Sequence, residues 1–97
     1  GGGLTGNLPR IISKKLSIEL NSKNLPDNDL FSWFKNISRL TNQEMLSTFN
    51  CGIGMALIIS KKDLKKAKNF FDKNKEEFFI IGRTIKNTRN GENCKII

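Results

Sequence analysis

The chain has 97 residues and a formal net charge of +8, with 37% hydrophobic and 27% charged residues. A chain of this length forms one domain at most, and its composition is typical of globular rather than disordered proteins. No apolar run approaches the roughly 20 residues that span a bilayer, and no basic and apolar leader marks the chain for export, so neither a membrane partner nor a secreted protein is expected.

The chain opens with the run Gly1–Gly3, which suits a flexible terminus, a cloning remnant or a phosphate loop that leads into a helix. No Gly-Lys-Ser/Thr follows the run, so a P-loop is excluded. Pro9 is tolerated only near the start of a helix, because deeper in the helix it removes a backbone hydrogen bond. The next apolar residues recur at the spacing of one helix face and predict a short helix: Leu4, Leu8, Ile11 and Ile12.

Leu16–Leu20 alternates strictly between apolar and polar residues, which predicts a strand with one buried face. A polar connection then leads to Asp27 or Asn28, either of which can cap a helix. We expect Trp33 to be a core anchor of that helix rather than a ligand contact, because of the apolar area it hides. The residues expected to face inward share one helical stripe: Leu30, Trp33, Phe34 and Ile37.

In the middle of the chain, the spacing of apolar residues changes from that of a helix to that of a strand. Thr41–Glu44 has the pattern of a capping box at the start of a helix, and Met55–Ile59 is a short apolar run that predicts a buried strand. The turn Asn50–Gly54 joins them and contains two glycines, which permit backbone angles closed to other residues. This turn is either a helix C-cap followed by a bulge or a place where the backbone meets a ligand.

Ser60–Asp63 has a second helix-capping pattern, and the lysine-rich helix that it begins extends to about Asn74. Phe78–Ile81 predicts another buried strand that continues past Gly82. Asn90-Gly91 is a strong hairpin signal that folds Cys94–Ile97 back as a last strand. The order of elements indicates an α+β fold, with a single mixed or antiparallel sheet of about four strands and helices packed on one face.

The positive charge does not indicate a nucleic-acid partner. Most of the lysines between positions 61 and 73 lie opposite the apolar residues of one helical pattern, as on a solvated helix face. The chain has no tyrosine, and its phenylalanines stand at core spacing, so the aromatic stacking surface of a single-strand binder is missing. We therefore expect no nucleic-acid binding.

Side chains capable of catalysis are sparse. The chain has no histidine, which excludes a histidine-based triad and the commonest metal ligand. Cys51 and Cys94 are too few and too irregular for a disulfide framework or a zinc site, so we expect reduced, buried thiols in a cytoplasmic protein. What remains is a site of backbone and amide groups that binds without titrating, with no catalytic residue and no metal.

Two segments resemble the phosphoribosylformylglycinamidine cyclo-ligase family, also called aminoimidazole ribonucleotide (AIR) synthetase. The first is Met45–Met55, which reads Met-Leu-Ser-Thr-Phe-Asn-Cys-Gly-Ile-Gly-Met, and the second is Gly1–Arg10. Trp33-Phe34 and Ile80–Gly82 also fall in family order. The resemblance implies that residues 1–97 are the C-terminal portion of an AIR-synthetase-type C-terminal domain. The His-Ile-Thr that precedes the glycine run in the family is absent here.

The resemblance also implies a function. The family uses ATP to activate the formyl oxygen of formylglycinamidine ribonucleotide, and the amidine nitrogen then closes the imidazole ring. ATP and Mg are expected in the full-length enzyme and not in this fragment, which should be inactive without the N-terminal ATP-binding domain. A phosphorylated purine precursor would meet these residues: Gly1, Gly2, Gly3, Asn7, Thr48, Asn50 and Gly52.

Two further expectations concern partners. A domain cut partway along leaves sheet edges and apolar faces bare, which predicts a homo-oligomer. The alternative to the ligase fragment is a stand-alone interaction or small-ligand-binding module derived from the same scaffold.

Overall fold

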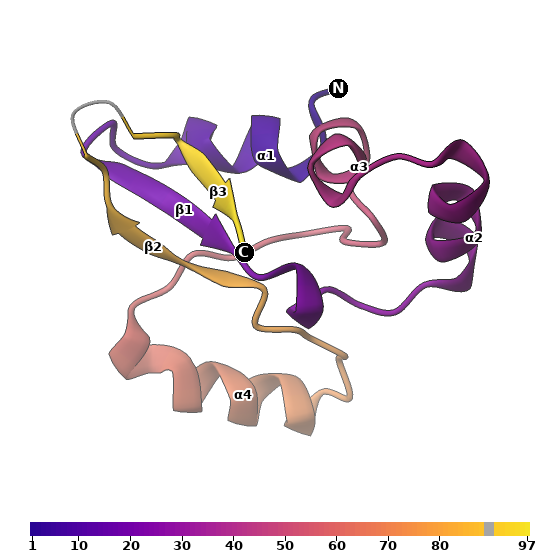
Figure 1. Cartoon of the computed structure of the whole chain (residues 1–97). Helices are drawn as coiled ribbons and strands as arrows, with labels where there is room; N and C mark the ends of the chain where they lie inside the picture. The colour runs from indigo at the N-terminus through magenta and orange to yellow at the C-terminus, as the bar shows by residue number, and fades with distance from the viewer. Residues whose placement is uncertain (89–90) are drawn as a thin grey trace.

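The structure is a computed structural model that describes residues 1–88 and 91–97. It is an α+β fold, as predicted, whose helices and strands are drawn in Figure 1. The helices are α1 (Gly3–Asn7), α2 (Asp29–Ser38), α3 (Asn42–Thr48) and α4 (Leu64–Lys73). The strands are β1 (Leu16–Leu20), β2 (Gly82–Lys86) and β3 (Cys94–Ile96). Short 3₁₀ turns occur at Leu8–Ile11, Ser22–Asn24 and Lys61–Asp63.

The described strands form one mixed sheet in the order β2-β1-β3, so the sheet has three strands where about four were expected. β1 runs antiparallel to β2, with Leu20 opposite Gly82, and parallel to β3, with Ile18 opposite Cys94. The predicted strand at Leu16–Leu20 is therefore confirmed, and it is the central strand. The polar Ser17 of β1 is also buried, and its hydroxyl donates to the Glu92 carbonyl at 2.6 Å.

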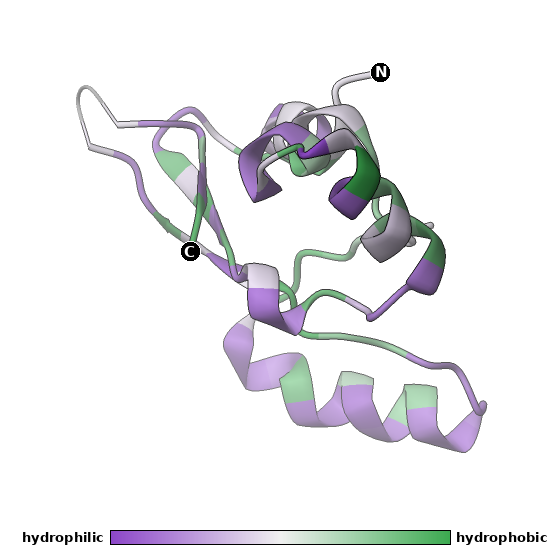
Figure 2. Ribbon diagram, turned by 45° about the vertical axis from the view of Figure 1, so that its right-hand side comes forward, coloured by the Kyte–Doolittle hydropathy of each residue, from purple (hydrophilic) through white to green (hydrophobic). Residues whose placement is uncertain are grey.

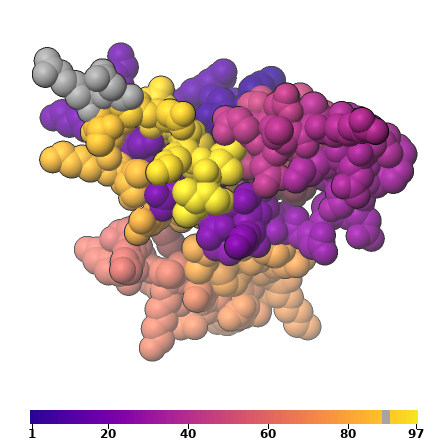
Figure 3. Space-filling model, viewed as in Figure 1, coloured from indigo at the N-terminus to yellow at the C-terminus, as the bar shows by residue number. Residues whose placement is uncertain are grey.

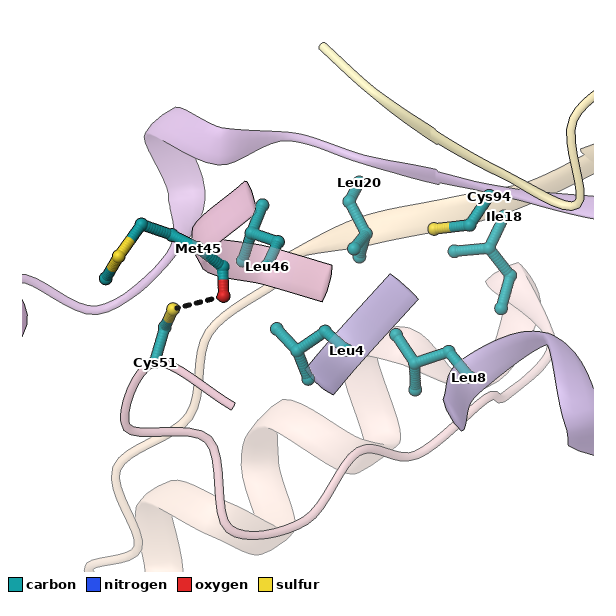
Figure 4. Close-up of a cluster of buried hydrophobic side chains, with 8 residues drawn as sticks. All are labelled: Leu4, Leu8, Ile18, Leu20, Met45, Leu46, Cys51 and Cys94. Carbon is teal, nitrogen blue, oxygen red and sulfur yellow. Dashed lines mark hydrogen bonds between the residues drawn. The ribbon is translucent and has the colours of Figure 1, made fainter. Parts of the chain in front are cut away.

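α1 and α3 cover one face of the sheet and enclose the hydrophobic core with it. Leu4 of α1 and Leu8 of the 3₁₀ turn that follows it lie in one cluster with Leu46 of α3 and Leu20 of β1 (Figure 4). α2 and α4 lie outside this layer, at the margins of the molecule (Figure 1). The buried residues are Leu4, Leu8, Ile18, Leu20, Met45, Leu46, Cys51 and Cys94.

The first predicted helix is confirmed only in its opening part. α1 ends at Asn7, and the chain tightens into a 3₁₀ turn over Leu8–Ile11 with Pro9 at its start. Proline lacks the N–H that would continue the helical hydrogen bonds, which accounts for the change. Leu4 and Leu8 lie in the core as expected, whereas Ile11 is exposed.

α2 begins where the sequence predicts, because the Asn28 side chain accepts hydrogen bonds from the N–H groups of Leu30 and Phe31. The prediction that Trp33 anchors the core is wrong. Trp33 is 57% exposed, and Leu30 and Ile37 on the same stripe are also exposed. Aromatic packing sets the inner face of α2 instead, since the rings of Phe31 and Phe34 pack on Phe49 with centroids 6.1 and 5.4 Å away.

One predicted strand does not form, and another forms only in its later part. Met55–Ile59 has no strand pairing, and Leu57 is 62% exposed rather than buried. The hydrophobic chain between α3 and α4 runs outside any helix or strand in Figure 2. The strand predicted from Phe78 past Gly82 forms as β2, which begins at Gly82 opposite Leu20. Just before it, the Ile81 carbonyl accepts from the Asn21 N–H at 2.8 Å, whereas Phe78–Ile80 lies outside the sheet. Both segments lack a neighbouring strand, without which an extended segment cannot join a sheet.

The last strand does not pair with the strand before it, as the predicted hairpin requires. The Asn90 half of its Asn90-Gly91 turn lies outside the described residues. The last strand exists as Cys94–Ile96, but it pairs with β1 and not with β2, because β1 lies between them. Contacts that are distant along the chain, such as Ser17 with Glu92, therefore determine where the C-terminus lies.

The helix predicted after Ser60 forms as α4, but the Ser60 side chain makes no capping hydrogen bond and a 3₁₀ turn comes first. Phe71 packs on Phe78 with ring centroids 5.2 Å apart, which holds the segment after α4 against the helix. Figure 3 shows the α4 region along the lower margin of the molecule. No helix within the described ranges, 1–88 and 91–97, is long and apolar enough to cross a membrane.

The capping box at the start of α3 is confirmed. The Thr41 hydroxyl accepts from the Glu44 N–H at 3.2 Å, and the Glu44 carboxylate accepts from the Thr41 N–H at 2.7 Å. The hydrogen bonds from the Thr41 backbone and then its side chain hold the pKa of Glu44 below its usual value. α3 is thus fixed at its first turn, while its buried residues Met45 and Leu46 fix it against the sheet and α1.

Replacing Thr41 with alanine is expected to lower the free energy of unfolding at pH 7 by about 1 kcal/mol, because an orphan N–H loses its acceptor. The lowered pKa of Glu44 makes the stabilising form the charged one, so this carboxylate stabilises the fold near neutral pH and ceases to do so as the pH falls through its folded pKa. Urea unfolding at pH 7 and at acid pH measures both effects. Thr48→Ala at the other end of α3 should change little, and an equal loss in both variants would contradict the capping role.

Candidate functional site

The bend after α3 is a tight turn over residues 50–53. The Ile53 N–H donates to the Asn50 carbonyl at 3.0 Å, and both central residues have positive φ, 51° at Cys51 and 91° at Gly52. Two positive φ angles are the pattern of a type I′ turn. The sequence indicated a turn at its two glycines, but it is Cys51, not Gly54, that shares the left-handed backbone with Gly52.

Cys51 anchors this bend to the core. Its thiol lies 3.9 Å from the carbonyl oxygens of both Met45 and Phe49, toward which it donates, and the contact with Met45 is drawn in Figure 4. Burial raises the pKa of Cys51 above its ordinary value, and burial together with the charge of Glu92 raises the pKa of Cys94. Neutral thiols are poor nucleophiles, which agrees with a structural role for both cysteines.

With an aromatic disulfide reagent at pH 7.5, both thiols of the folded chain are expected to react at least about tenfold more slowly than in the urea-unfolded chain. The absorbance of the released thiolate follows the reaction. Because the folded pKa values are raised, burial of the neutral thiols stabilises the fold below their unfolded pKa, and this contribution disappears as the pH rises through the folded pKa. A thiol that reacts at the unfolded rate at pH 7.5 would contradict the buried, neutral state.

The glycine run lies directly against the end of α3. Gly3 has a φ of 57°, and a Cβ atom built on it would overlap the Leu46 carbonyl oxygen and lie 2.9 Å from that of Phe49. The Asn7 side-chain amide donates to the carbonyls of Gly1 and Gly3 at 3.1 and 2.7 Å. The run is therefore tied down on both sides, unlike the flexible terminus that is one of its sequence interpretations.

The structure brings most of the predicted site residues to one place and separates one of them. Gly1–Gly3 and Asn7 adjoin the end of α3, where Thr48 and Asn50 flank Phe49 and are exposed. Gly52 faces a different part of the surface, since the nearest atoms to its added Cβ belong to Asn28 and Pro26 at 3.4 and 3.8 Å. Sequence proximity alone groups Gly52 with Asn50, but the turn between them reverses the chain.

A groove of about 340 Å³ lies on that other side, between α2, α3 and the loop before α2. Lys23 and Lys35 line it together with Asp27, and Cys51 forms part of its floor. None of the predicted site residues, Gly52 included, lines it, so the groove and the glycine run are separate features. No local motif marks the groove, because its walls come from segments that only the fold brings together.

The described residues offer few groups for binding a metal ion. Within residues 1–88 and 91–97 there is no group of three or more His, Cys, Asp or Glu side chains that could hold one. A nucleotide-bound Mg²⁺ is usually held by one or two carboxylates together with phosphate oxygens. The described residues therefore contain no cluster that would hold a metal ion by itself, and none of them is assigned to Mg-ATP.

Residues 1–95 match the family described as AIR synthase related protein, C-terminal domain. The chain belongs to this family. The match covers the glycine run, the capped α3 and the bend after it, which are the segments that carry the sequence resemblance, and the resemblance is thereby confirmed. The AIR synthase C-terminal domain accordingly includes both the ordered Gly1–Gly3 run and the Asn50–Ile53 turn of this chain.

Similar proteins include the phosphoribosylformylglycinamidine cyclo-ligase of Nitrosococcus oceani, 37% identical over 92 residues, which are 95% of this chain and 26% of the relative. The cyclo-ligase of Ligilactobacillus salivarius is 36% identical over 97 residues, which are all of this chain and 28% of the relative. The human trifunctional purine biosynthetic protein adenosine-3 is 32% identical over 96 residues, which are 99% of this chain and 10% of that protein. The chain therefore spans about a quarter of the length of the cyclo-ligases it matches.

Proposed function

We propose that this AIR synthase C-terminal domain contributes part of the substrate cleft of a cyclo-ligase that closes the imidazole ring of formylglycinamidine ribonucleotide. The observation that carries the proposal is the packing of Gly3 on the carbonyl oxygens of Leu46 and Phe49. It brings together two segments that are some forty residues apart in the sequence, with Gly3 itself buried where they meet. The relatives that share both segments are cyclo-ligases by name.

In this proposal, Thr48 and Asn50 contact the phosphorylated purine precursor. Both are exposed, and a hydroxyl and a side-chain amide can donate and accept hydrogen bonds without changing charge near neutral pH. Asn7 acts as a positioning residue, because its amide already holds the carbonyls of Gly1 and Gly3. Such a site favours ring closure by orienting the substrate and stabilising developing charge rather than by supplying a nucleophile.

ATP and Mg²⁺ are assigned to the longer enzyme, in its N-terminal ATP-binding domain. This assignment is supported by the lack of a carboxylate cluster among the described residues of this chain and by the length of the relatives. The chain alone should then be inactive in ring closure, and its working location is the cytoplasm. The chain supplies one wall of a cleft, and the ATP-binding domain supplies the other.

Complementation in trans tests the proposal. The region of the N. oceani ligase that precedes the matched segment is combined with this chain, and ATP-dependent ring closure is measured. The matched quarter of the N. oceani ligase serves as a control with the same upstream region. We expect activity with both partners and none with either part alone. Activity with the control but not with this chain would overturn the proposal and favour the stand-alone module, whereas Asn7→Ala should lower a restored activity.

We also propose that the isolated chain self-associates. The support lies in the apolar side chains left exposed outside the core, among them Trp33, Met55, Leu57 and Phe70. Large exposed apolar surfaces of this kind mark interaction sites. The sheet edges add unpaired backbone groups to these surfaces.

A further inference from the structure

The segment Met55–Ile59 lies beside the core without joining the sheet. Ala56 packs against the core, whereas Met55 is 81% exposed and Leu57 is 62% exposed. Within the described residues, no hydrogen bond joins the backbone of residues 54–59 to any other group. Free N–H and C=O groups in a segment with apolar, β-prone side chains form a template for pairing with another strand.

The edges of the sheet itself resist such pairing. β2 carries Arg83 and Lys86, and β3 has only three residues, with Lys95 in the middle. Charge, especially lysine, and short length are the usual features that stop edge strands from pairing further. Between Asn50 and Ser60, by contrast, the chain contains no charged residue. An additional strand would therefore meet the least resistance at Met55–Ile59.

The size of the segment limits what can pair with it. A ladder of five residues buries far less than the roughly 800 Å² per partner of a standard interface, which is too little to hold separate molecules together. The same ladder can form within one polypeptide, because a linked strand is present at an effective concentration in the millimolar range. The partner that suits this segment is therefore another part of the same polypeptide.

The relatives are long enough to supply such a strand. The matched residues are 26% of the N. oceani ligase and 28% of the L. salivarius ligase, so about three quarters of each protein lies outside them. We propose that, in the longer enzyme, a strand from the region that precedes the matched segment pairs with Met55–Ile59. This inference rests on the proposed function, which assigns the other wall of the cleft to that region, and it names the contact that joins the two parts.

The pairing would fix the bend after α3 relative to the rest of the enzyme. The Ile53 N–H closes that bend on the Asn50 carbonyl. Met55 follows Ile53 by two residues, which span about 7 Å at roughly 3.3 Å per extended residue. Asn50 is one of the residues assigned to the phosphorylated precursor. A strand paired at Met55 therefore holds Asn50 at a defined distance from the opposite wall of the cleft.

Amide hydrogen exchange, resolved by residue with NMR, tests the inference. It is measured in this chain alone and in a chimera in which the chain replaces the matched quarter of the N. oceani ligase. In the chain alone, the amides of residues 55–59 should exchange within about tenfold of the unstructured rate, because none has an acceptor. In the chimera, the paired amides should exchange at least about a hundredfold more slowly. Ile18, whose N–H donates to the Asn93 carbonyl at 2.9 Å, should be slow in both.

The pattern of slow amides distinguishes strand pairing from simple burial. Along one edge of a strand, only every second residue directs its N–H toward the partner. Slow exchange should therefore alternate, either at residues 55, 57 and 59 or at residues 56 and 58. Uniformly slow exchange would mean that the longer enzyme covers the segment without pairing with it, and would overturn the inference.

Two matched substitutions test the same contact through stability. Leu57→Asp should leave the urea midpoint of the chain alone nearly unchanged, because residue 57 is exposed there, and should lower the midpoint of the chimera. Leu30→Asp is the matched control, because Leu30 has nearly the same exposure, 65% against 62%, but lies on α2. It should affect both proteins alike. If Leu57→Asp prevents the chimera from folding, Leu57→Thr should give a smaller loss in the same direction.

Three further results would overturn the inference. The amides of residues 55–59 exchange quickly in a folded chimera, or they become slow only in the chain alone at high concentration, or Leu30→Asp lowers the midpoint of the chimera more than Leu57→Asp does. The second result would assign the segment to another copy of this chain. If the chimera does not fold, the intact N. oceani ligase is measured instead, and fast exchange in its aligned segment would overturn the inference equally.

None of these measurements involves ring closure, so a failure here is distinct from a failure of the proposed purine function. Alternating slow amides without ring closure in the complementation assay would leave the pairing standing and remove the proposed function. Ring closure with fast amides in the chimera would do the reverse.

Discussion

Replacing Gly3 with alanine is expected to lower the free energy of unfolding by about 3 kcal/mol or more. Two costs add at this position. The left-handed φ of 57° is strained for a residue with a Cβ atom, at about 1–3 kcal/mol. The new Cβ also overlaps backbone atoms of Leu46 and Ser47, which cannot rotate away as a side chain could, and overpacking of this kind costs a further 1–3 kcal/mol or so. Urea unfolding followed by circular dichroism measures the loss.

Two other glycines separate these costs. Gly2 also has a positive φ, 97°, but an added Cβ would meet nothing closer than 3.5 Å, so Gly2→Ala should incur the strain alone. Gly54 has neither a positive φ nor a neighbour within 4 Å, and Gly54→Ala should be neutral or slightly stabilising. Equal losses for Gly2→Ala and Gly3→Ala would mean that the contact between the glycine run and α3 is not made in solution.

The Gly3→Ala variant also tests the proposed substrate cleft. If Gly3→Ala shifts α1 away from α3, it should also separate the glycine run from Thr48 and Asn50. In the complementation assay we then expect it to lose more activity than Gly54→Ala, measured at a temperature where both variants remain folded. Retained activity in Gly3→Ala would argue against a cleft that uses the two segments together.

Local patterns were predictable from the sequence wherever a few neighbouring residues determine the structure. The capping box at Thr41 and Glu44 and the Asn28 cap are both present, because each depends on side chains within three residues of the N–H groups they bind. The alternation in Leu16–Leu20 identified the central strand for a similar reason. The resemblance to the AIR synthase family also rests on contiguous residues, and it too is confirmed.

Features that depend on distant partners were not predictable. Apolar content showed that Met55–Ile59 can form a strand, but pairing needs a neighbour, and β1 has its two edges occupied by β2 and β3. The stripe of α2 that contains Trp33 was predicted to face the core because it is apolar. In the structure, the adjacent face of α2 packs on Phe49 instead. For the site, the sequence pointed to the glycine run and the bend after α3, which the fold brings together, but it could not show that the turn at Cys51 directs Gly52 toward Asn28.

Replacing Leu20 with alanine is expected to destabilise the fold by about 2–5 kcal/mol, the usual range for deleting a buried leucine. Leu20 is only 1% exposed, and it lies on the strand that joins β2 to β3 and faces α1 and α3. Small domains are stable by about 5–15 kcal/mol, and the core here has eight residues, so the variant should lie near its unfolding transition in water. The midpoint of urea unfolding gives the loss.

Leu16→Ala on the same strand is the matched control for this deletion. Leu16 is 37% exposed at the start of β1, so less apolar area and no closed cavity are lost, and about 1 kcal/mol or less is expected. If Leu20→Ala does not fold, Leu20→Val removes a single methylene and should cost about 1 kcal/mol, which keeps the comparison measurable. Equal effects at positions 16 and 20 would mean that β1 is not enclosed between its neighbours as described. The sheet would then not hold α1 and α3 in the arrangement on which the proposed site depends.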